Sequence, residues 1–180
     1  MSDASSSQLI RSLEQLDQHD HACLLYASAQ EQFAVLAPFM QLGLTRGERC
    51  LYVADDNTPE AVIAGFRRYG VELESAIASG QFLLLTKREA YLRNGVFRPD
   101  DMLALLEKTT AEAGAAGYSG VRGSGEMTWA LDGSPGNDRL MEYESKLNHL
   151  LDLHQILAIC QYNRRRFSPE LLVNAIRTHP

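Results

Sequence analysis

The sequence predicts a single α/β domain in which helices flank a mostly parallel sheet. Short apolar runs typical of strands recur along the chain, and stretches with the apolar spacing of helices lie between them. Several runs are almost continuously apolar, as in strands that are buried on both faces of a sheet. Strands that alternate with helices in this way pair in parallel through right-handed crossovers.

Five runs are the expected strands of this sheet. In chain order they span 21–27 (HACLLYA), 49–54 (RCLYVA), 81–86 (QFLLLT), 119–124 (SGVRGS) and 155–162 (QILAICQY). Ligands of such sheets collect beyond the carboxyl ends of the strands. Residues at those ends are therefore candidate site residues, whereas residues at strand starts, such as His21, are not.

The expected helices carry end signals of their own. Thr58-Pro59 and Ser168-Pro169 each combine a capping hydroxyl with a proline in the first turn, which is typical of a helix start. Pro38 is expected to kink the helix in which it lies. The expected helical stretches are 9–16, 30–45, 59–69, 71–79, 100–114, 137–151 and 168–178.

Composition restricts the class of protein. The chain has 180 residues, of which 45% are hydrophobic and 22% are charged, so it is long enough and apolar enough for one globular core. No apolar run approaches the roughly 18 residues of a membrane-spanning helix, and the start of the chain does not resemble a secretory signal. We therefore expect a cytoplasmic protein without membrane contacts.

The net charge of −6 argues against a broad surface for nucleic acid, and we expect no direct nucleic-acid partner. The run Arg164-Arg165-Arg166 is a local exception. It is either a solvated turn or a contact for an anion.

The three cysteines, Cys23, Cys50 and Cys160, are widely spaced, which favours reduced, buried thiols over a disulfide framework. His19, His21 and Cys23 alternate along a strand start, so a thiol–imidazole metal site that includes Cys160 is one interpretation. A reversible Cys23–Cys160 redox switch is another. The spacing matches no closed zinc pattern, so we assign neither a metal nor a cofactor.

A hydrolase is not expected. Ser28 and His21 lie at opposite ends of one predicted strand, roughly 20 Å apart at about 3.3 Å per residue. The sequence also lacks a G-x-S-x-G motif. We therefore expect no catalytic residues.

The strings DHACLLY, GERCLYVADDNTPEAVIAGFRRYGVELESAIASGQFLLL, GVRGSGEMTWAL and ICQYNRRRFSPELLVNAIRTHP occur in this order. On these motifs the chain resembles MEDS domains, the sensory modules named after methanogen, methylotroph and DcmR-type regulators. The resemblance covers residues 19–180 and leaves 1–18 as a tail, helix or linker. MEDS domains in turn resemble the three-layer RecA/KaiC-like ATPase core, which implies a five-stranded sheet in the order 3-2-4-5-1.

The resemblance also places Ser28 to Gln32 where the phosphate loop of such an ATPase would lie, and Gly125-Glu126 near its metal-binding acidic position. A phosphate loop needs glycines and a lysine, and the segment ASAQEQF has neither. Glu31 would in addition repel phosphate. We therefore expect a degenerate loop without hydrolysis of nucleoside triphosphates.

The candidate ligand-binding residues at the carboxyl edge of the sheet are Tyr26, Ser28, Glu126, Trp129, Tyr162 and Arg164. The segment GSGEMTW offers one carboxylate among soft and aromatic side chains, which suits a mostly apolar pocket with few polar anchors. Its alternative role is a glycine-rich turn with Trp129 in the core.

Four finer expectations concern the surroundings of this site. The hydroxyls of Tyr26 and Tyr162 converge on one cavity, or each packs at an edge with its hydroxyl in water. Arg164 pairs with Glu126, anchors a ligand carboxylate, or forms a surface salt bridge. The segment 87–98 acts as a lid through Tyr91 and Phe97. Asp55-Asp56 resembles the acidic turn after the second strand of such cores, or it is only a capping cluster ahead of Thr58, which we favour.

The function implied by the resemblance is that of a non-enzymatic sensory domain. It would bind a small, largely apolar molecule, such as a hydrocarbon derivative, and signal to an output kinase, transcription factor or other regulatory domain. One alternative is an interaction module without a small ligand, for instance a homodimer, that uses the 9–16 stripe and the 168–178 helix. A further alternative is nucleotide binding without hydrolysis.

Overall fold

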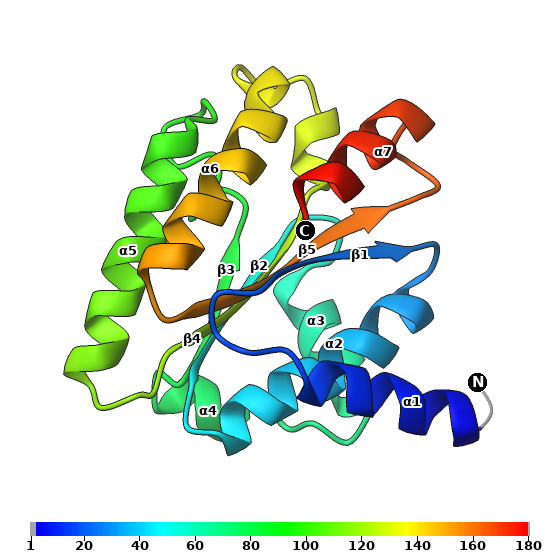
Figure 1. Ribbon diagram of the computed structural model, residues 1–180, viewed down its shortest axis with the longest axis vertical. Coiled ribbons are helices and arrows are strands. Elements are labelled where there is room, and N and C mark those ends of the chain that lie inside the picture. Colours follow the sequence, from blue (N-terminus) through cyan, green and yellow to red (C-terminus); the bar gives the residue numbers. More distant parts are fainter. Residues whose placement is uncertain (1–2, 180) are drawn as a thin grey trace.

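Five parallel strands form a single sheet within residues 3–179, the part of the chain that the computed structural model describes. The strands are β1 (His21–Tyr26), β2 (Arg49–Ala54), β3 (Phe82–Thr86), β4 (Val121–Glu126) and β5 (Ile156–Asn163). Their order is β1-β5-β4-β2-β3, which is 3-2-4-5-1 from the other edge (Figure 1). The predicted fold class and strand order are confirmed.

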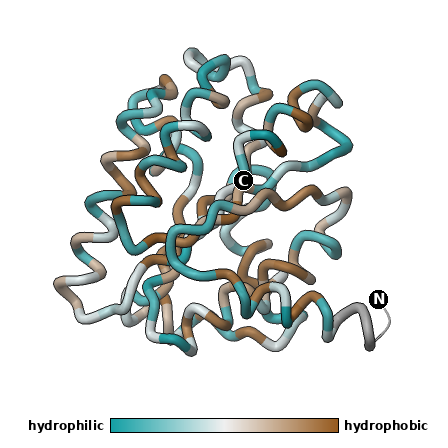
Figure 2. The backbone as a smooth tube through the Cα atoms, viewed as in Figure 1, coloured by the Kyte–Doolittle hydropathy of each residue, from teal (hydrophilic) through white to brown (hydrophobic). Residues whose placement is uncertain are grey.

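Helices cover both faces of this sheet and make the three layers visible in Figure 1. One face carries α1 (Asp3–Glu14), α2 (Ala29–Thr45), α3 (Pro59–Arg67) and α4 (Glu74–Ala78). The other carries α5 (Pro99–Ala115), α6 (Leu140–Leu153) and α7 (Pro169–Thr178), with the short 3₁₀ turns η1 (Thr128–Leu131) and η2 (Asn137–Arg139) after β4. Hydrophobic segments follow the sheet and the inward sides of the helices (Figure 2). None of the helices among the described residues is long and apolar enough to cross a membrane.

The predicted helix starts are confirmed in detail. The side chains of Thr58 and Ser168 accept hydrogen bonds from the backbone N–H groups of Ala61 and Leu171, at 3.2 and 3.3 Å. A proline occupies the first turn in both helices, where its missing N–H costs nothing. Pro38 lies inside α2, which nevertheless continues from Ala29 to Thr45.

Strand β4 begins and ends two residues later than the sequence predicted. It spans 121–126 instead of 119–124, so Gly125 and Glu126 belong to the strand and not to a turn beyond it. Gly117, between α5 and β4, has a positive φ of 84° and turns the chain there. The strand begins four residues after this turn, at Val121. The shift brings Glu126 into the buried end of the sheet, where all six residues of β4 are buried.

Strand register assigns alternate residues to the two cores. Gly123, Ala158 and Cys160 face α5 and α6, whereas Ser124 and Gln161 face α2. The central strand therefore offers the α5–α6 side two glycines, Gly123 and Gly125, instead of bulky side chains. It offers the α2 side polar groups that must find partners.

A buried ion pair closes the α2 side near the amino end of the sheet. Arg122 in β4 is completely buried, and its Nη2 donates to Glu48 Oε1 at 3.2 Å. Its guanidinium lies 4.6 Å from the ring centre of Phe39. Gly43 in α2 makes room for it, because a Cβ at that position would lie 2.7 Å from Arg122 Cδ.

Replacement of Glu48 by glutamine is expected to lower the free energy of unfolding by about 3 kcal/mol, because it leaves the buried Arg122 charge without a counter-ion. Urea denaturation of the two proteins measures this difference. The matched control is Glu72→Gln, which removes the exposed pair with Arg67 and should leave the midpoint unchanged. Equal midpoints for Glu48→Gln and the wild type would contradict this account of the ion pair.

Candidate functional site

Glu126, the last residue of β4, is fully buried and accepts five hydrogen bonds from the described residues. Tyr52 Oη and Asn57 Nδ2 donate to Oε1 at 2.7 Å, and Gln32 Nε2 donates to it at 3.3 Å. The backbone N–H groups of Asp55 and Asn57 donate to Oε2 at 2.8 and 3.0 Å. The carboxylate thus joins β4, β2, the β2–α3 loop and α2.

A chain of side-chain amides continues this network across the sheet. Gln32 Nε2 donates to Gln161 Oε1 at 2.7 Å, Gln161 Nε2 donates to Ser124 Oγ at 2.9 Å, and Ser124 Oγ donates to the carbonyl of Ile159. Burial, reinforced by the Glu126 carboxylate, raises the pKa of Tyr52 well above its usual range, so its hydroxyl remains a donor. The hydrogen bonds of the Glu126 carboxylate therefore all come from other residues of the same chain.

The first turn of α2 is capped by its own side chains. Ser28 Oγ accepts from the backbone N–H of Glu31 at 3.2 Å, and Glu31 Oε2 accepts from the N–H of Ala27 at 2.9 Å. Arg164 Nη1 lies 2.8 Å from Glu31 Oε2. Of the three alternatives for Arg164, the structure therefore shows the surface salt bridge, with Glu31 as the partner, and not a pair with Glu126.

The acidic turn after β2 ties neighbouring loops together. Asp55 Oδ1 lies 2.8 Å from Lys87 Nζ, and Asp55 Oδ2 accepts from Thr128 Oγ1 at 2.7 Å. Asp56 forms an ion pair with Arg166. The prediction that Asp55-Asp56 caps α3 is wrong, because Thr58 performs that role and the two aspartates face the loops after β3, β4 and β5.

Tyr26 and Tyr162 lie on opposite faces of the sheet, so their hydroxyls do not converge. In the register of β1 and β5, Tyr26 pairs with Asn163, and Tyr162 pairs with Leu25. The Tyr162 hydroxyl donates to Glu144. The Tyr26 hydroxyl is buried and has no hydrogen-bond partner within residues 3–179. Burial and the nearby Glu126 carboxylate raise the pKa of Tyr26, which keeps its proton.

An aromatic cluster covers the carboxyl end of β4 on the α5–α6 side. Trp129 is fully buried, with its ring centre 4.8 Å from that of Tyr91 and 4.2 Å from that of Phe97. Tyr143 of α6 meets Phe97 edge-on at 5.7 Å. The segment 87–98 is thus packed on the domain in this structure. Trp129 Nε1 is buried without a hydrogen-bond partner among the described residues.

A small cavity lies beneath this aromatic cluster. It has a volume of about 30 Å³, and its lining residues are mostly apolar or lack a side chain, among them Tyr91, Leu106, Gly123, Gly125, Met127 and Tyr143. Gly125 is required here, because a Cβ at that position would collide with the Tyr91 hydroxyl. Gly123 is less constrained, since the nearest atom to its Cβ position is the Leu157 carbonyl oxygen at 3.9 Å.

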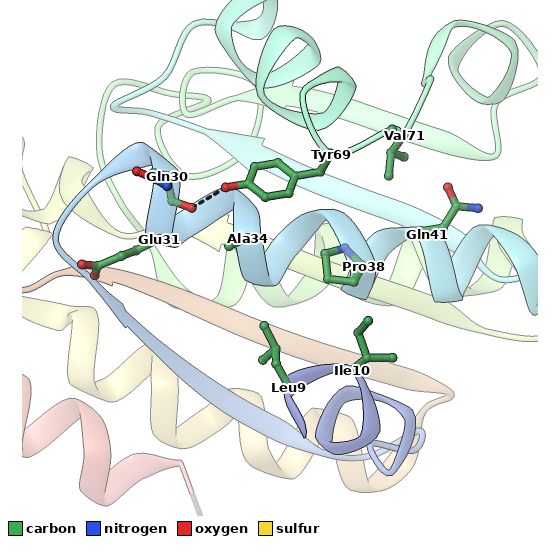
Figure 3. A pocket seen from close by; sticks show the side chains of 10 residues that line it. Leu9, Ile10, Gln30, Glu31, Ala34, Pro38, Gln41, Tyr69 and Val71 are labelled. Atoms are coloured by element: carbon green, nitrogen blue, oxygen red, sulfur yellow. Dashed lines mark hydrogen bonds between the residues drawn. The ribbon is translucent and has the colours of Figure 1, made fainter. Parts of the chain in front are cut away.

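An open groove of about 620 Å³ lies on the outer side of α2, between α1 and the turn after α3 (Figure 3). Leu9 and Ile10 form one wall, and Tyr69 spans the other side, where its hydroxyl donates to the carbonyl of Gln30 at 2.9 Å. None of the six candidate ligand-binding residues lines this groove among the described residues.

The structure also brings together a group of side chains that sequence reasoning combined only in part. Of the residues considered for a metal, His21 and Cys160 meet at 3.3 Å, and they are joined by Glu144 and His179, which were not considered. A signal for Glu144 was present. It lies four residues after Leu140 and three before Leu147, so it occupies the apolar stripe of its helix.

Comparisons with known proteins agree with this architecture. The family model described as MEDS, MEthanogen/methylotroph, DcmR Sensory domain, matches residues 20–180. A curated relative, the transcriptional repressor DcmR of Methylorubrum extorquens (strain DSM 6343 / CIP 106787 / DM4), is 28% identical over 163 residues. The match covers 89% of this chain and 58% of the repressor, so the chain spans little more than half of that relative.

Among solved structures, the KaiC-like protein PH0186 from Pyrococcus horikoshii OT3 matches with a TM-score of 0.59 and 15% identity. The match covers 80% of this chain and 61% of that protein. At this level of identity the likeness shows a shared KaiC-like fold.

Replacement of Glu126 by glutamine is expected to lower the free energy of unfolding by about 3 kcal/mol, because the new amide group would face N–H donors in a buried site. Chemical denaturation provides the measurement. Glu107→Gln on the exposed side of α5 is the matched control and should behave like the wild type. If the two variants unfold at the same denaturant concentration, Glu126 does not hold the edge of the sheet together.

Proposed function

The chain belongs to the MEDS family of sensory domains, and from this premise we propose that it binds a small, largely apolar molecule and signals the bound state to a regulatory output. The observation that carries the proposal is the small, mostly apolar cavity between the glycines of β4 and helices α5 and α6. Sites for small molecules are mostly apolar and enclosed by protein. Here the enclosure is the aromatic cluster of Tyr91, Phe97, Trp129 and Tyr143.

The size of the cavity determines how a ligand would enter. A volume of about 30 Å³ holds little more than one water molecule, so even a compact organic ligand requires Tyr91 and the 87–98 segment to move. A ligand that fits only the opened form shifts the equilibrium toward that form. Movement of the segment would also alter the Lys87–Asp55 and Lys87–Asp132 ion pairs, which bind it to the carboxyl edge of the sheet.

Of the six residues predicted for the ligand site, Trp129 belongs to this proposal as a wall of the aromatic cluster. Glu126 supports the site from behind by fixing the end of β4. Among the described residues, none of the other four lines the cavity: Ser28 caps α2, Arg164 pairs with Glu31 from the loop after β5, and Tyr26 and Tyr162 lie in β1 and β5.

A non-enzymatic role is part of the same proposal. Ser28 accepts from the N–H of Glu31 in the first turn of α2, and the carboxylate of Glu31 accepts from the N–H of Ala27 just before the helix. The negative charge of Glu31 opposes a phosphate there. Hydrogen bonds from Arg164 and the Ala27 N–H lower the pKa of Glu31, which keeps this charge at neutral pH. The KaiC-like core then acts as a scaffold, with the output in a kinase, a transcription factor or another regulatory region.

A second candidate function is docking of a protein partner without a small ligand. The groove of about 620 Å³ beside α2 favours it, since Ile10 and Tyr69 leave apolar surface exposed there. A homodimer through this face is one form of that alternative.

The two functions are distinguished by native mass spectrometry of gently purified protein, followed by thermal unfolding with a panel of apolar compounds of a few carbon atoms. Ligand sensing predicts a co-purifying compound or a rise of the melting temperature, because a ligand at 100 times its Kd stabilises by about 2.7 kcal/mol. Neither signal, together with a dimer peak, would favour docking.

Gly123→Ala tests the position of the site. The added methyl group meets no atom closer than 3.9 Å and points into the cavity, so the fold should persist while the ligand-induced rise of the melting temperature disappears. Gly114→Ala, on the exposed surface of α5, is the matched control and should retain the full rise. An equal rise in both variants would exclude this cavity as the binding site.

A further inference from the structure

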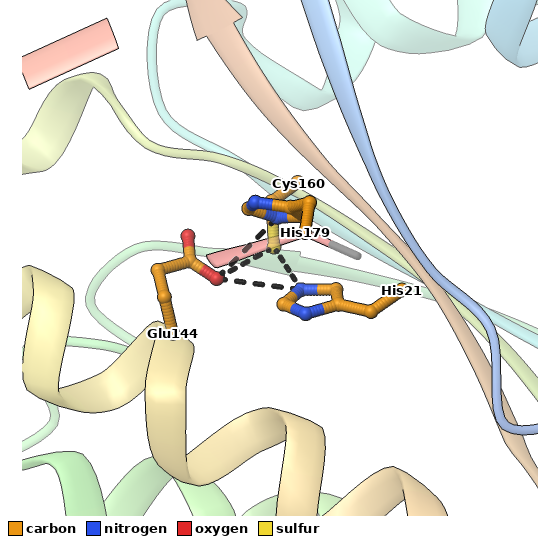
Figure 4. A group of neighbouring side chains, drawn as sticks. All are labelled: His21, Glu144, Cys160 and His179. Atoms are coloured by element: carbon orange, nitrogen blue, oxygen red, sulfur yellow. Dashed lines mark hydrogen bonds and ion pairs between the residues drawn. The ribbon is translucent and has the colours of Figure 1, made fainter. Parts of the chain in front are cut away.

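Four side chains capable of binding a metal converge on the buried side of α6 (Figure 4). They are His21 at the start of β1, Glu144 in α6, Cys160 in β5 and His179 after α7. Their potential ligand atoms all lie within 4.8 Å of one another. The side chains of His21, Glu144 and His179 are at most 3% exposed, and Cys160 is buried.

Four of the six separations within this cluster are close to those of a tetrahedral metal site, and none exceeds 4.8 Å. His21 Nε2 lies 3.3 Å from both Cys160 Sγ and Glu144 Oε2. Glu144 Oε2 lies 3.4 Å from Cys160 Sγ and 3.7 Å from His179 Nε2. Zinc bonds of about 2.0–2.3 Å place the ligand atoms of a tetrahedron about 3.3–3.6 Å apart. A small shift of the side chains would complete the coordination.

The outer nitrogens of both imidazoles are fixed as donors. Asn148 Nδ2 donates to the carbonyl of Thr178 at 2.7 Å, so the Asn148 oxygen is the atom that faces His21 Nδ1, also at 2.7 Å. That oxygen can only accept, and His21 Nδ1 therefore carries the hydrogen. His179 Nδ1 lies 2.6 Å from the carbonyl of Ala175 and is a donor for the same reason.

When both imidazoles are neutral, their inner nitrogens present lone pairs to the centre of the cluster. Two Nε2 lone pairs and the Glu144 carboxylate face each other there, and the Cys160 thiol supplies a single proton. His179 Nε2 is buried and has no hydrogen-bond partner among the described residues. A buried group of acceptors with one proton is unfavourable unless a further positive charge enters it.

We propose that His21, Glu144, Cys160 and His179 form a binding site for a divalent transition metal ion of the zinc type. Two neutral imidazoles, one thiolate and one carboxylate balance the two positive charges of such an ion, so the filled site is neutral in its buried surroundings. Cys160 releases its proton to solvent when the metal–sulfur bond forms. With four protein ligands the coordination is complete, which is typical of a structural site.

The surroundings of the cluster are those that metal ligands need. Asn148 and the Ala175 carbonyl orient the two imidazoles, and Tyr162 donates to the second oxygen of Glu144. Such contacts fix the tautomer and direction of each ligand. A surface pocket of about 510 Å³, which His21 and His179 line from the inside, gives the ion a path from solvent.

The first test is metal content. Protein stripped with a chelator, incubated with Zn²⁺ and desalted should retain one equivalent by elemental analysis, and Zn²⁺ should raise its melting temperature. His179→Gln should weaken binding by at least about tenfold, since loss of a supporting contact alone costs 10–100-fold. His149→Gln, a histidine of α6 outside the cluster, is the matched control and should bind like the wild type.

The second test identifies the ligands. Co²⁺ in place of Zn²⁺ should give the visible bands of tetrahedral cobalt and a thiolate charge-transfer band, which Cys160→Ser removes and Cys23→Ser, on the neighbouring strand, retains. Circular dichroism of the metal-free variants verifies folding, and His179→Gln decides the outcome if Cys160→Ser does not fold. Less than one equivalent of zinc in the wild type, or a zinc affinity of His179→Gln equal to that of the wild type, would overturn the proposal. The four side chains would then be held together by hydrogen bonds through a shared proton.

Discussion

The carboxylate of Glu126 lies where β4, β2 and α2 meet, and it is the one negative charge in the polar network of Gln32, Tyr52, Asn57 and Gln161. A buried charge is tolerated only when hydrogen bonds replace its lost hydration. The donors that do so come from a strand, a loop and a helix, so each of these elements is held at a fixed position. The end of β4, the aromatic cluster beyond it and the start of α2 all depend on this arrangement.

The two faces of the sheet solve different physical problems. On the α2 side, Ser124 and Glu126 must be satisfied by hydrogen bonds, which demands rigid geometry. On the α5–α6 side, Tyr91 fills the room beside Gly125, and the room beside Gly123 belongs to the small cavity. One strand therefore combines a rigid side with a side that contains unfilled space, an arrangement suited to a domain that senses by small movements.

The sequence was sufficient to predict what depends on local patterns. Apolar runs predicted the strands, and the Thr58-Pro59 and Ser168-Pro169 pairs predicted helix starts. The resemblance supplied the strand order. Partners across long sequence separations were not predictable in this way. The Arg164–Glu31 pair and the assignment of Tyr26 and Tyr162 to opposite faces depend on strand register. Glu126 was expected beyond the strand as the polar anchor of a pocket, and the two-residue shift of β4 makes it a buried strand residue instead.

Three consecutive residues of β5 serve two partners on opposite faces of the sheet: Cys160 and Tyr162 face Glu144, and Gln161 faces Gln32. A shift of β5 by a single residue would move every side chain to the other face of the sheet. Gln161 would then point into the apolar core, and Cys160 would point into the amide network. Misaligned pairings are therefore penalised several times over during folding. The polar side chains that form the native network therefore also disfavour any pairing of β5 that is shifted by one residue.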